Sequence, residues 1–412
     1  MSVTSLAAAC VLLLSPAVAV PATTAPVPAV RVAAAAPRTG APAPGAGEPV
    51  PPPATASADP SLLRRPGVQT RPATGVAAPP PLSARSWLVA DARTGAVLAA
   101  RDAHERLPPA STLKALFALT VLPRLDSGAR HTVADTELAE IGDGSSLVGV
   151  KENLTYRVSD LWNGVFLSSG NDAVHVLAGM NGGWEETTRQ MQRTAESLGA
   201  RDTRVVSPDG YDAPGQVSSA YDLAVFGREG LKNPDFVRYA GTADAQFPAD
   251  GWSFGIKNTN RLVTGADGVA RYPGILGLKN GYTSGAGHTL IAAARKGPHT
   301  LVVTVMNPQD GGAYTVYEEA RALLDWGFTA VGRTQPVGSL TTAPATLPAA
   351  ATPVAAGPAA APPGHPVAEA AEKKGPGLAL PLVFLASAAL AALFLWRRLR
   401  RRRPKPAADF DW

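Results

Sequence analysis

A serine and a lysine lie three residues apart in the stretch Ser111-Thr112-Leu113-Lys114, directly after two prolines and at the start of a long apolar run. Prolines before such a run predict a helix start, which places Ser111 in the first turn. Residues three apart share a helix face, so the Lys114 amine can reach the Ser111 hydroxyl and accept its proton. The pair is typical of nucleophilic catalysis if burial or a second cation lowers the pKa of the lysine. A serine at a helix start is also a common N-cap, so the pair alone is weak evidence of catalysis.

Two further polar clusters lie downstream. Ser169 and Asn171 belong to a short S-S-G-N stretch between two helical segments, where a hydroxyl and an amide could face one pocket. Lys279 begins a K-N-G-Y-T stretch, residues 279–283, at the end of a predicted strand, and its glycine permits a ligand to approach the backbone closely. Turn chemistry explains each cluster by itself, as an N-capped loop and as a hairpin turn.

The elements that must position these residues are predicted by hydrophobic periodicity. Strands are expected at 86–92, 96–100, 274–279, 289–294 and 300–306, and helices at 158–166, 172–179, 184–198, 219–226 and 314–326. Strands therefore come from both ends of this region, with helices between them. This order favours an α/β domain in which an early hairpin joins late strands, with an all-helical insertion.

Proline usage divides the 412 residues into unlike segments. Residues 1–84 hold 17 prolines and residues 329–376 hold nine, whereas the 244 residues from 85 to 328 hold only ten. A single globule is therefore excluded, and residues 85–328 are the predicted folded domain. Residues 20–84 are expected to be a disordered Pro/Ala-rich segment, and residues 329–376 a Pro/Ala-rich linker.

Both ends of the chain predict export and anchoring. Residues 1–19 read as a signal peptide with an A-x-A cleavage site, although no Lys or Arg precedes Arg31. Residues 377–396 carry no charge and are long enough to cross a bilayer, and arginines follow at once. We therefore expect a transmembrane helix, a basic cytoplasmic tail at 397–412 and an extracytoplasmic domain in the cell membrane. The sole cysteine, Cys10, would be removed with the signal, which excludes disulfides and thiol chemistry.

The basic charge of the chain is confined to its tail. Residues 397–412 carry seven cations and two anions, a net charge of +5 that equals the net charge of the whole chain. The residues before this tail therefore sum to a net charge of zero, and no nucleic-acid partner is expected for the folded domain. The six histidines are scattered singly, so neither a metal site nor a cofactor is predicted.

Taken together and in this order, the three clusters resemble the S-x-x-K, S-x-N and K-T-G motifs of penicillin-recognising serine enzymes. More closely, residues 85–328 resemble the D-alanyl-D-alanine carboxypeptidase family, the low-molecular-mass penicillin-binding proteins that are serine peptidases of the S11 type. Further stretches that carry the resemblance are 91–95, 108–114, 168–173, 209–210 with 214–215, 219–224 and 323–328. One departure is Asn280, which stands where the family pattern has threonine.

The resemblance implies a serine β-lactamase/transpeptidase-like fold, an antiparallel sheet flanked by helices plus an all-helical subdomain. It also implies removal of the terminal D-alanine from peptidoglycan stem peptides ending in D-Ala-D-Ala, with β-lactams as covalent inhibitors. In the catalytic roles that the resemblance implies, Ser111 is the nucleophile, Lys114 is its base, and Ser169 donates a proton to the leaving group, while Lys279 helps to keep Lys114 neutral. In substrate binding, Asn171 holds the substrate backbone, Lys279 and Thr283 bind the substrate carboxylate, and Gly281 and Tyr282 contribute backbone to the substrate site. The backbone amides of Ser111 and Tyr282 form the oxyanion hole.

Three alternatives stay open from sequence. A class A β-lactamase would share the first motif but needs a glutamate for deacylation, and no E-x-x-L-N stretch is present. A peptidoglycan DD-endopeptidase would use the same residues. A catalytically inert wall-binding membrane protein would be expected to have lost Ser111 or Lys114, and both are present.

Overall fold

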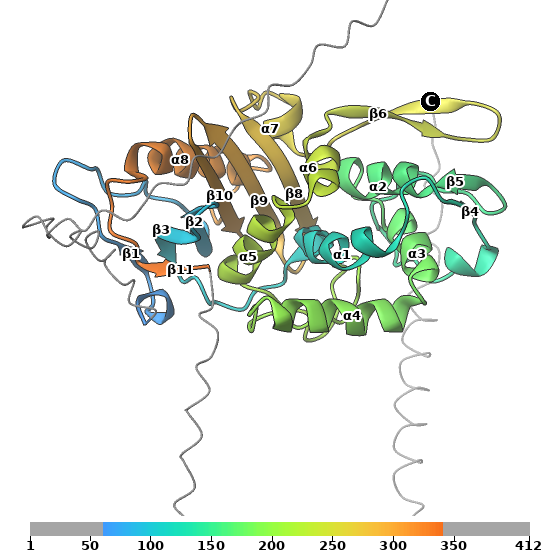
Figure 1. Ribbon diagram of the computed structural model, residues 1–412, viewed down its shortest axis with the longest axis horizontal. Helices are drawn as coiled ribbons and strands as arrows, with labels where there is room; N and C mark the ends of the chain where they lie inside the picture. The colour runs from blue at the N-terminus through green and yellow to red at the C-terminus, as the bar shows by residue number, and fades with distance from the viewer. Residues whose placement is uncertain (1–60, 341–412) are drawn as a thin grey trace, which may run out of the picture. The chain divides into compact units, whose positions relative to one another are not determined.

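The computed structural model describes residues 61–340, in which one antiparallel sheet is the central element (Figure 1). Its strand order is β1-β3-β2-β10-β9-β8, and a seventh strand, β11, also pairs with β3. The strands are β1 Val68–Thr70, β2 Ser86–Asp91, β3 Ala96–Arg101, β8 Ile275–Thr283, β9 Gly287–Lys296, β10 His299–Met306 and β11 Gly338–Ser339. The early hairpin therefore joins the late strands, as predicted, because β2 pairs with β10.

The sheet separates two hydrophobic cores. Successive side chains of a strand point to opposite faces, so Trp87 and Val89 pack with α8 Thr315–Ala330, whereas Leu88 and Ala90 belong to the core on the other face. That second core contains α5 Ala220–Gly230 and continues into the helical part of the molecule. The buried strands β9 and β10 are nearly continuous apolar runs because both of their faces are covered.

The helical part lies beside β8 and carries the other half of the site (Figure 1). Its elements are η2 Ala110–Leu113, α1 Lys114–Val121, η3 Leu122–Arg124, η4 Asp135–Glu137, α2 Val158–Leu167, α3 Asn171–Met180, α4 Trp184–Ser197 and α6 Pro234–Gly241. The short helix α7 Arg261–Thr264 instead contributes Leu262 to the core on the α8 face of the sheet. Aromatic side chains fill its interior: the rings of Trp162 and Phe117 lie 5.4 Å apart, and those of Phe166 and Phe236 meet edge to face at 5.1 Å. Such pairs contribute beyond the area that they bury.

Two pairs of short antiparallel strands interrupt the expected all-helical subdomain. They are β4 Arg130–Thr132 with β5 Thr155–Arg157, and β6 Asp244–Pro248 with β7 Ser253–Lys257. Strands of three to five residues are too short to show a clear alternation of polar and apolar positions, which is why the pattern did not predict them. The α/β fold with an antiparallel sheet and a helical subdomain is otherwise as expected.

The folded domain is wider than the predicted 85–328. Part of the stretch predicted as disordered, residues 61–84, contains a short helical turn, η1 Leu62–Arg64, and strand β1, which pairs with β3. The indole nitrogen of Trp326 donates to the carbonyl of Ala77 over 2.9 Å. At the other boundary, β11 pairs with β3 and extends the domain beyond residue 328. Proline is tolerated beside these short strands because they lie at the margin of the sheet. Proline content alone therefore placed the domain boundaries too far inward.

Within residues 61–340, no helix combines the length and apolar character needed to cross a bilayer. The predicted signal peptide at 1–19, transmembrane helix at 377–396 and basic tail at 397–412 lie outside the described residues.

Candidate active site

The Lys114 amine is the centre of the site. It donates to Ser111 Oγ over 2.9 Å, to Asn171 Oδ1 over 2.7 Å and to the carbonyl oxygen of Asp209 over 2.5 Å. The short η2 turn at Ala110–Leu113 runs directly into α1, so both residues lie on one helical turn, as their spacing predicted. Lys114 is 1 % exposed, so all three acceptors are needed to satisfy its buried donors.

Asn171 connects the first and second motifs. It is the first residue of α3, and its amide Nδ2 donates to Ser145 Oγ over 3.0 Å while its oxygen accepts from Lys114. The next residue, Asp172, accepts from the backbone amides of residues 148, 149 and 150 over 2.8–3.0 Å. One helix start therefore positions both the Lys114 amine and the loop that carries Ser145.

The two lysines of the site both have lowered pKa values. Burial lowers the pKa of Lys114 to about 8, against the opposing effect of the Asp209 and Asp172 carboxylates. Lys279 is also fully buried, and burial, followed by the positive charge of Lys114, places its pKa well below the ordinary value. Repulsion between two cations is mutual, so a proton on either amine disfavours a proton on the other.

Ser169 has an unusual environment. It has a positive φ of 58°, a sparsely populated region for a residue other than glycine. Its hydroxyl is buried and has no hydrogen-bond partner in the described part of the chain. A strained backbone and an unsatisfied buried hydroxyl are costly, and such features cluster at functional sites.

Strand β8 forms the other wall of the site. A Cβ built on Gly281 would lie 2.7 Å from the backbone nitrogen of Ser111, so this glycine allows the strand to pass directly beside the serine. The neighbouring Tyr282 is 62 % exposed and packs on the ring of His288 at 4.6 Å. Because β8 is the last strand of the sheet, its outer edge can pair with an extended peptide.

Two residues of the third motif bind other parts of the protein. The Thr283 hydroxyl donates to Asp212 Oδ1 over 2.7 Å. Asn280, which departs from the family pattern, accepts at Oδ1 from the Thr259 hydroxyl over 3.1 Å. The structure thus brings Thr283 to the site but shows its hydroxyl already engaged.

A cleft of about 260 Å³ opens over the serine. Its walls come from the loop that contains Ser145, from the segment after Asp209 and from the end of β8; the lining residues are Ser111, Asp143, Gly144, Ser145, Ser146, Asn171, Gly210, Tyr211, Asp212, Tyr282, Thr283 and Ser284. Lys114 and Lys279 are buried beside it. In residues 61–340, no group of three or more His, Cys, Asp or Glu side chains is arranged to hold a metal ion.

The sequence analysis assigned no role to four residues in or beside this cleft. Ser145 holds Asn171, Asp209 holds Lys114, Tyr211 donates to the carbonyl of Asp143 over 2.8 Å, and Asp212 holds Thr283. Asp209 was part of the resemblance but had no role, because its contact is made by a backbone carbonyl. No residue-type signal identifies such a contact.

The comparison with known proteins decides the family. Residues 73–310 match the family described as D-alanyl-D-alanine carboxypeptidase, peptidase S11, which covers more than half of the chain. The chain belongs to this family of serine peptidases. It is 41 % identical over 263 residues to a D-alanyl-D-alanine carboxypeptidase of Mycobacterium tuberculosis, DacB2, an alignment that covers 62 % of this chain and 86 % of that protein.

Solved structures agree with this assignment. A crystal structure of a D-alanyl-D-alanine carboxypeptidase from Mycobacterium tuberculosis superposes with a TM-score of 0.60 at 36 % identity, covering 66 % of this chain and all of that one. Penicillin-binding protein 6B from Escherichia coli superposes with a TM-score of 0.55 at 34 % identity, covering 63 % and 82 % of the two chains. The predicted fold class and the predicted serine peptidase family are therefore confirmed.

Proposed function

We propose that this protein removes the terminal D-alanine from peptidoglycan stem peptides through an acyl-enzyme on Ser111, and that β-lactams acylate the same serine. The observation that carries the proposal is the 2.9 Å hydrogen bond between Lys114 Nζ and Ser111 Oγ, made by a fully buried amine whose pKa is lowered to about 8. An amine with this pKa is partly neutral near neutral pH and can act as a base. The names of the relatives support the choice of substrate.

In the acylation step, Ser111 Oγ bonds to the carbonyl carbon between the two D-alanines. The hydroxyl proton passes to Lys114, and the C–N bond breaks as the leaving D-alanine nitrogen takes up a proton. Ser169 is our candidate for delivering that proton, since its buried hydroxyl has no partner among the described residues. Water then attacks the ester carbon, which releases the shortened peptide and returns a proton to Ser111.

The carbonyl oxygen becomes negative during attack and needs donors that are fixed in advance. The backbone amides of Ser111 and Tyr282 are our candidates, because Gly281 brings β8 beside the Ser111 nitrogen. One such donor contributes about 3–4 kcal/mol in other serine enzymes. The outer edge of β8 would pair with the substrate backbone, and Asn171 would complete the opposite wall.

Lys279 would act through substrate binding. In the free protein the charge of Lys114 lowers the pKa of Lys279, so Lys279 alone does not ensure a neutral Lys114. A substrate carboxylate beside Lys279 would stabilise its ammonium form, and that cation would then disfavour a proton on Lys114. Carboxylate binding would thus prepare the base.

The test is labelling of the full-length protein with a fluorescent penicillin, together with product analysis on a stem pentapeptide. We expect a covalent adduct that S111A abolishes, and one D-alanine released per peptide. Absence of an adduct would contradict the acyl-enzyme and favour an inert wall-binding protein. Rapid turnover of the drug would favour a β-lactamase, and cleavage of crosslinked dimers without D-alanine release would favour an endopeptidase.

We also propose that the catalytic domain lies on the outer side of the cell membrane, anchored by residues 377–396. The support is the uncharged stretch followed by arginines, together with the extracytoplasmic location of peptidoglycan, the proposed substrate. Protease added to intact spheroplasts should digest the domain and spare a C-terminal tag. Protection of the domain until the cells are lysed would contradict this orientation.

A further inference from the structure

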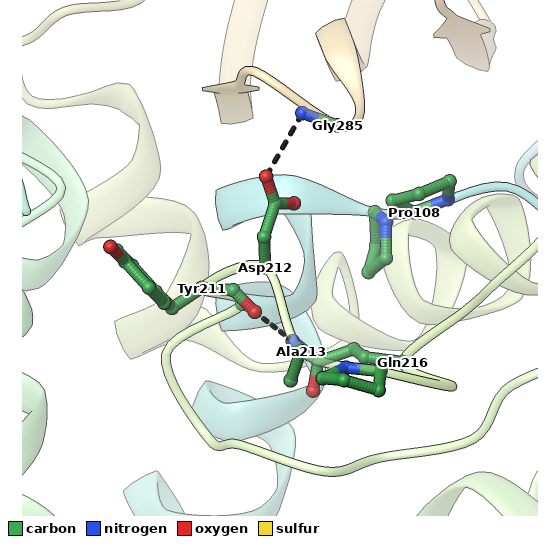
Figure 2. Close-up of a pocket in the computed structure, with 9 residues that line it drawn as sticks. Pro108, Tyr211, Asp212, Ala213, Gln216 and Gly285 are labelled. Atoms are coloured by element: carbon green, nitrogen blue, oxygen red, sulfur yellow. Dashed lines mark hydrogen bonds between the residues drawn. The ribbon is translucent and has the colours of Figure 1, made fainter. Parts of the chain in front are cut away.

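Residues 209–212 form a segment that crosses one end of the cleft; we call it the cleft strap. Its first carbonyl, at Asp209, accepts from Lys114, and a Cβ on Gly210 would lie 2.1 Å from the carbonyl oxygen of Ala110. Tyr211 then donates to the carbonyl of Asp143, on the helical wall. Asp212 reaches the opposite wall, at the end of β8. Figure 2 shows the side chains of Tyr211 and Asp212 pointing away from the cleft strap in different directions.

Asp212 uses both of its carboxylate oxygens on that wall. Oδ1 accepts from the Thr283 hydroxyl over 2.7 Å. Oδ2 accepts from the backbone amide of Gly285 over 2.9 Å (Figure 2). The Thr283 oxygen in turn accepts from the amide of Ala286 over 3.1 Å. A hydroxyl has one hydrogen, so Thr283 cannot donate to Asp212 and to a substrate carboxylate at the same time.

The hydrogen-bond donors of Thr283 and Gly285 suit a carboxylate, but another anion can replace the Asp212 carboxylate there. Asp212 is exposed, and no Lys, Arg or His in residues 61–340 forms an ion pair with it. Gly285 also lets the carboxylate come close, since a Cβ there would lie 2.9 Å from Asp212 Oδ2. Hydrogen bonds at such an exposed position compete with water and contribute little net free energy, so a second anion can replace this one.

We propose that Asp212 is a specificity-determining residue: its carboxylate occupies Thr283 in the free enzyme, and only a substrate with a free terminal carboxylate can displace it. This rests on the proposed function, in which Thr283 binds that carboxylate. Two carboxylates cannot share one hydroxyl donor and repel each other, so substrate binding moves Asp212 off Thr283. A substrate that is neutral at this position, such as a peptide amide, gains less from Thr283 and leaves Asp212 in place.

The test measures kcat and KM for a blocked tripeptide ending in D-Ala-D-Ala and for its C-terminal amide. Removing Asp212 relieves a competition that acts on the ground state and the transition state alike, so we expect D212A to lower KM for the acid about tenfold with kcat unchanged. KM for the amide should not change. In the T283V background, D212A should have no effect on either substrate.

D212N separates the charge from the hydrogen bond, because its amide oxygen can still accept from Thr283; we expect a smaller fall in KM. Asp250→Ala removes an exposed carboxylate from the turn between β6 and β7 and is the control for general charge effects. Thermal unfolding of each variant checks the fold.

Each other result overturns the inference. A fall in kcat with both substrates in D212A would mean that Asp212 only holds the cleft strap in its position. An equal fall in KM for acid and amide would mean that the Asp212 side chain blocks substrate binding sterically, without regard to the charge of the substrate. If amide cleavage is too slow to measure in all variants, the effect of D212A with and without T283V on the acid decides alone. Failure of penicillin to label the wild-type serine would overturn the proposed function and this inference together, whereas labelling without substrate discrimination would overturn only this inference.

Discussion

Gly281 lies so close to Ser111 that a Cβ at position 281 would fall 2.7 Å from the serine backbone nitrogen. The same Cβ would also lie 2.7 Å from Thr289 Oγ1 and 3.0 Å from Ala110 Cβ. The contact with Ser111 is to backbone, and the contact with Thr289 is to a buried side chain of β9, so a Cβ at position 281 would be enclosed on both sides. Strand β8 and the serine turn can therefore adopt this spacing only with glycine.

Gly281→Ala should therefore impair acylation. The added methyl must push β8 away from the serine amide, and misplacement of a catalytic group by about 1 Å can cost about a hundredfold in rate. We expect the rate constant for penicillin acylation to fall by about this factor, measured by the time course of fluorescent labelling. Gly255→Ala is the matched control, because the nearest atom to its Cβ, Gln246 Nε2, is 3.8 Å away. Equal rates for wild type and G281A would contradict the close approach.

The pH dependence of acylation follows from Lys114. Burial lowers the pKa of Lys114 to about 8, and only the neutral amine can take the Ser111 proton. The acylation rate should therefore rise about tenfold per pH unit below pH 8 and level off above it. Stopped-flow acylation between pH 5.5 and 9.5 measures this profile. A rate that falls as pH rises through 8 would contradict Lys114 as the base.

Local patterns predicted the main elements and the first motif. The hairpin of β2 and β3 and the strands β9 and β10 follow from apolar runs, and the contact of Lys114 with Ser111 follows from a spacing of three on one helical turn. Both kinds of signal are local, since each depends on residues within one element.

The contacts that shape the cleft could not be predicted in this way. Lys114 binds the Asp209 carbonyl across 95 residues of sequence, and Thr283 binds Asp212 across 71. Each pair joins two segments that are far apart in sequence and that only the tertiary fold brings together, and no composition or periodicity encodes that juxtaposition. The prediction that the Thr283 hydroxyl is free to bind the substrate carboxylate was incomplete for the same reason, since its hydrogen-bond partner Asp212 lies on another segment.

Asp172 should be a major source of stability for the loop of the helical wall. Its buried carboxylate accepts from the amides of residues 148, 149 and 150, and Asp172→Ala would leave these donors unpaired. An unpaired buried donor costs about 1–3 kcal/mol, so we expect at least about 3 kcal/mol of destabilisation in urea unfolding. Asp160→Ala is the control, because the Asp160 carboxylate accepts over 3.3 Å from the amide of Arg157 at an exposed position. Similar losses in both variants would contradict a special role for Asp172.

Asp222 should make the domain less stable as pH rises through the weakly acidic range. It is buried in α5, where Thr203 and the Asp202 amide donate to Oδ2 but Oδ1 has no partner within residues 61–340. Burial raises the pKa of Asp222 from 3.8 to about 6, with a smaller contribution from the charge of Asp202. The folded state therefore holds this proton more tightly than the unfolded state, so its stabilising effect is complete below pH 3.8 and is lost as pH rises to about 6.

Asp222→Asn should remove this dependence, because the amide keeps an acceptor for Thr203 and carries no charge at any pH. The free energy of unfolding of the variant, compared with that of wild type in urea, should rise relative to wild type between pH 4 and pH 7, by at most about 3 kcal/mol. The difference between the two proteins isolates this group, since all other titrating groups are shared. A difference that stays constant over this range would show that Asp222 is ionised in the folded domain throughout, and that its unpartnered oxygen is satisfied by solvent.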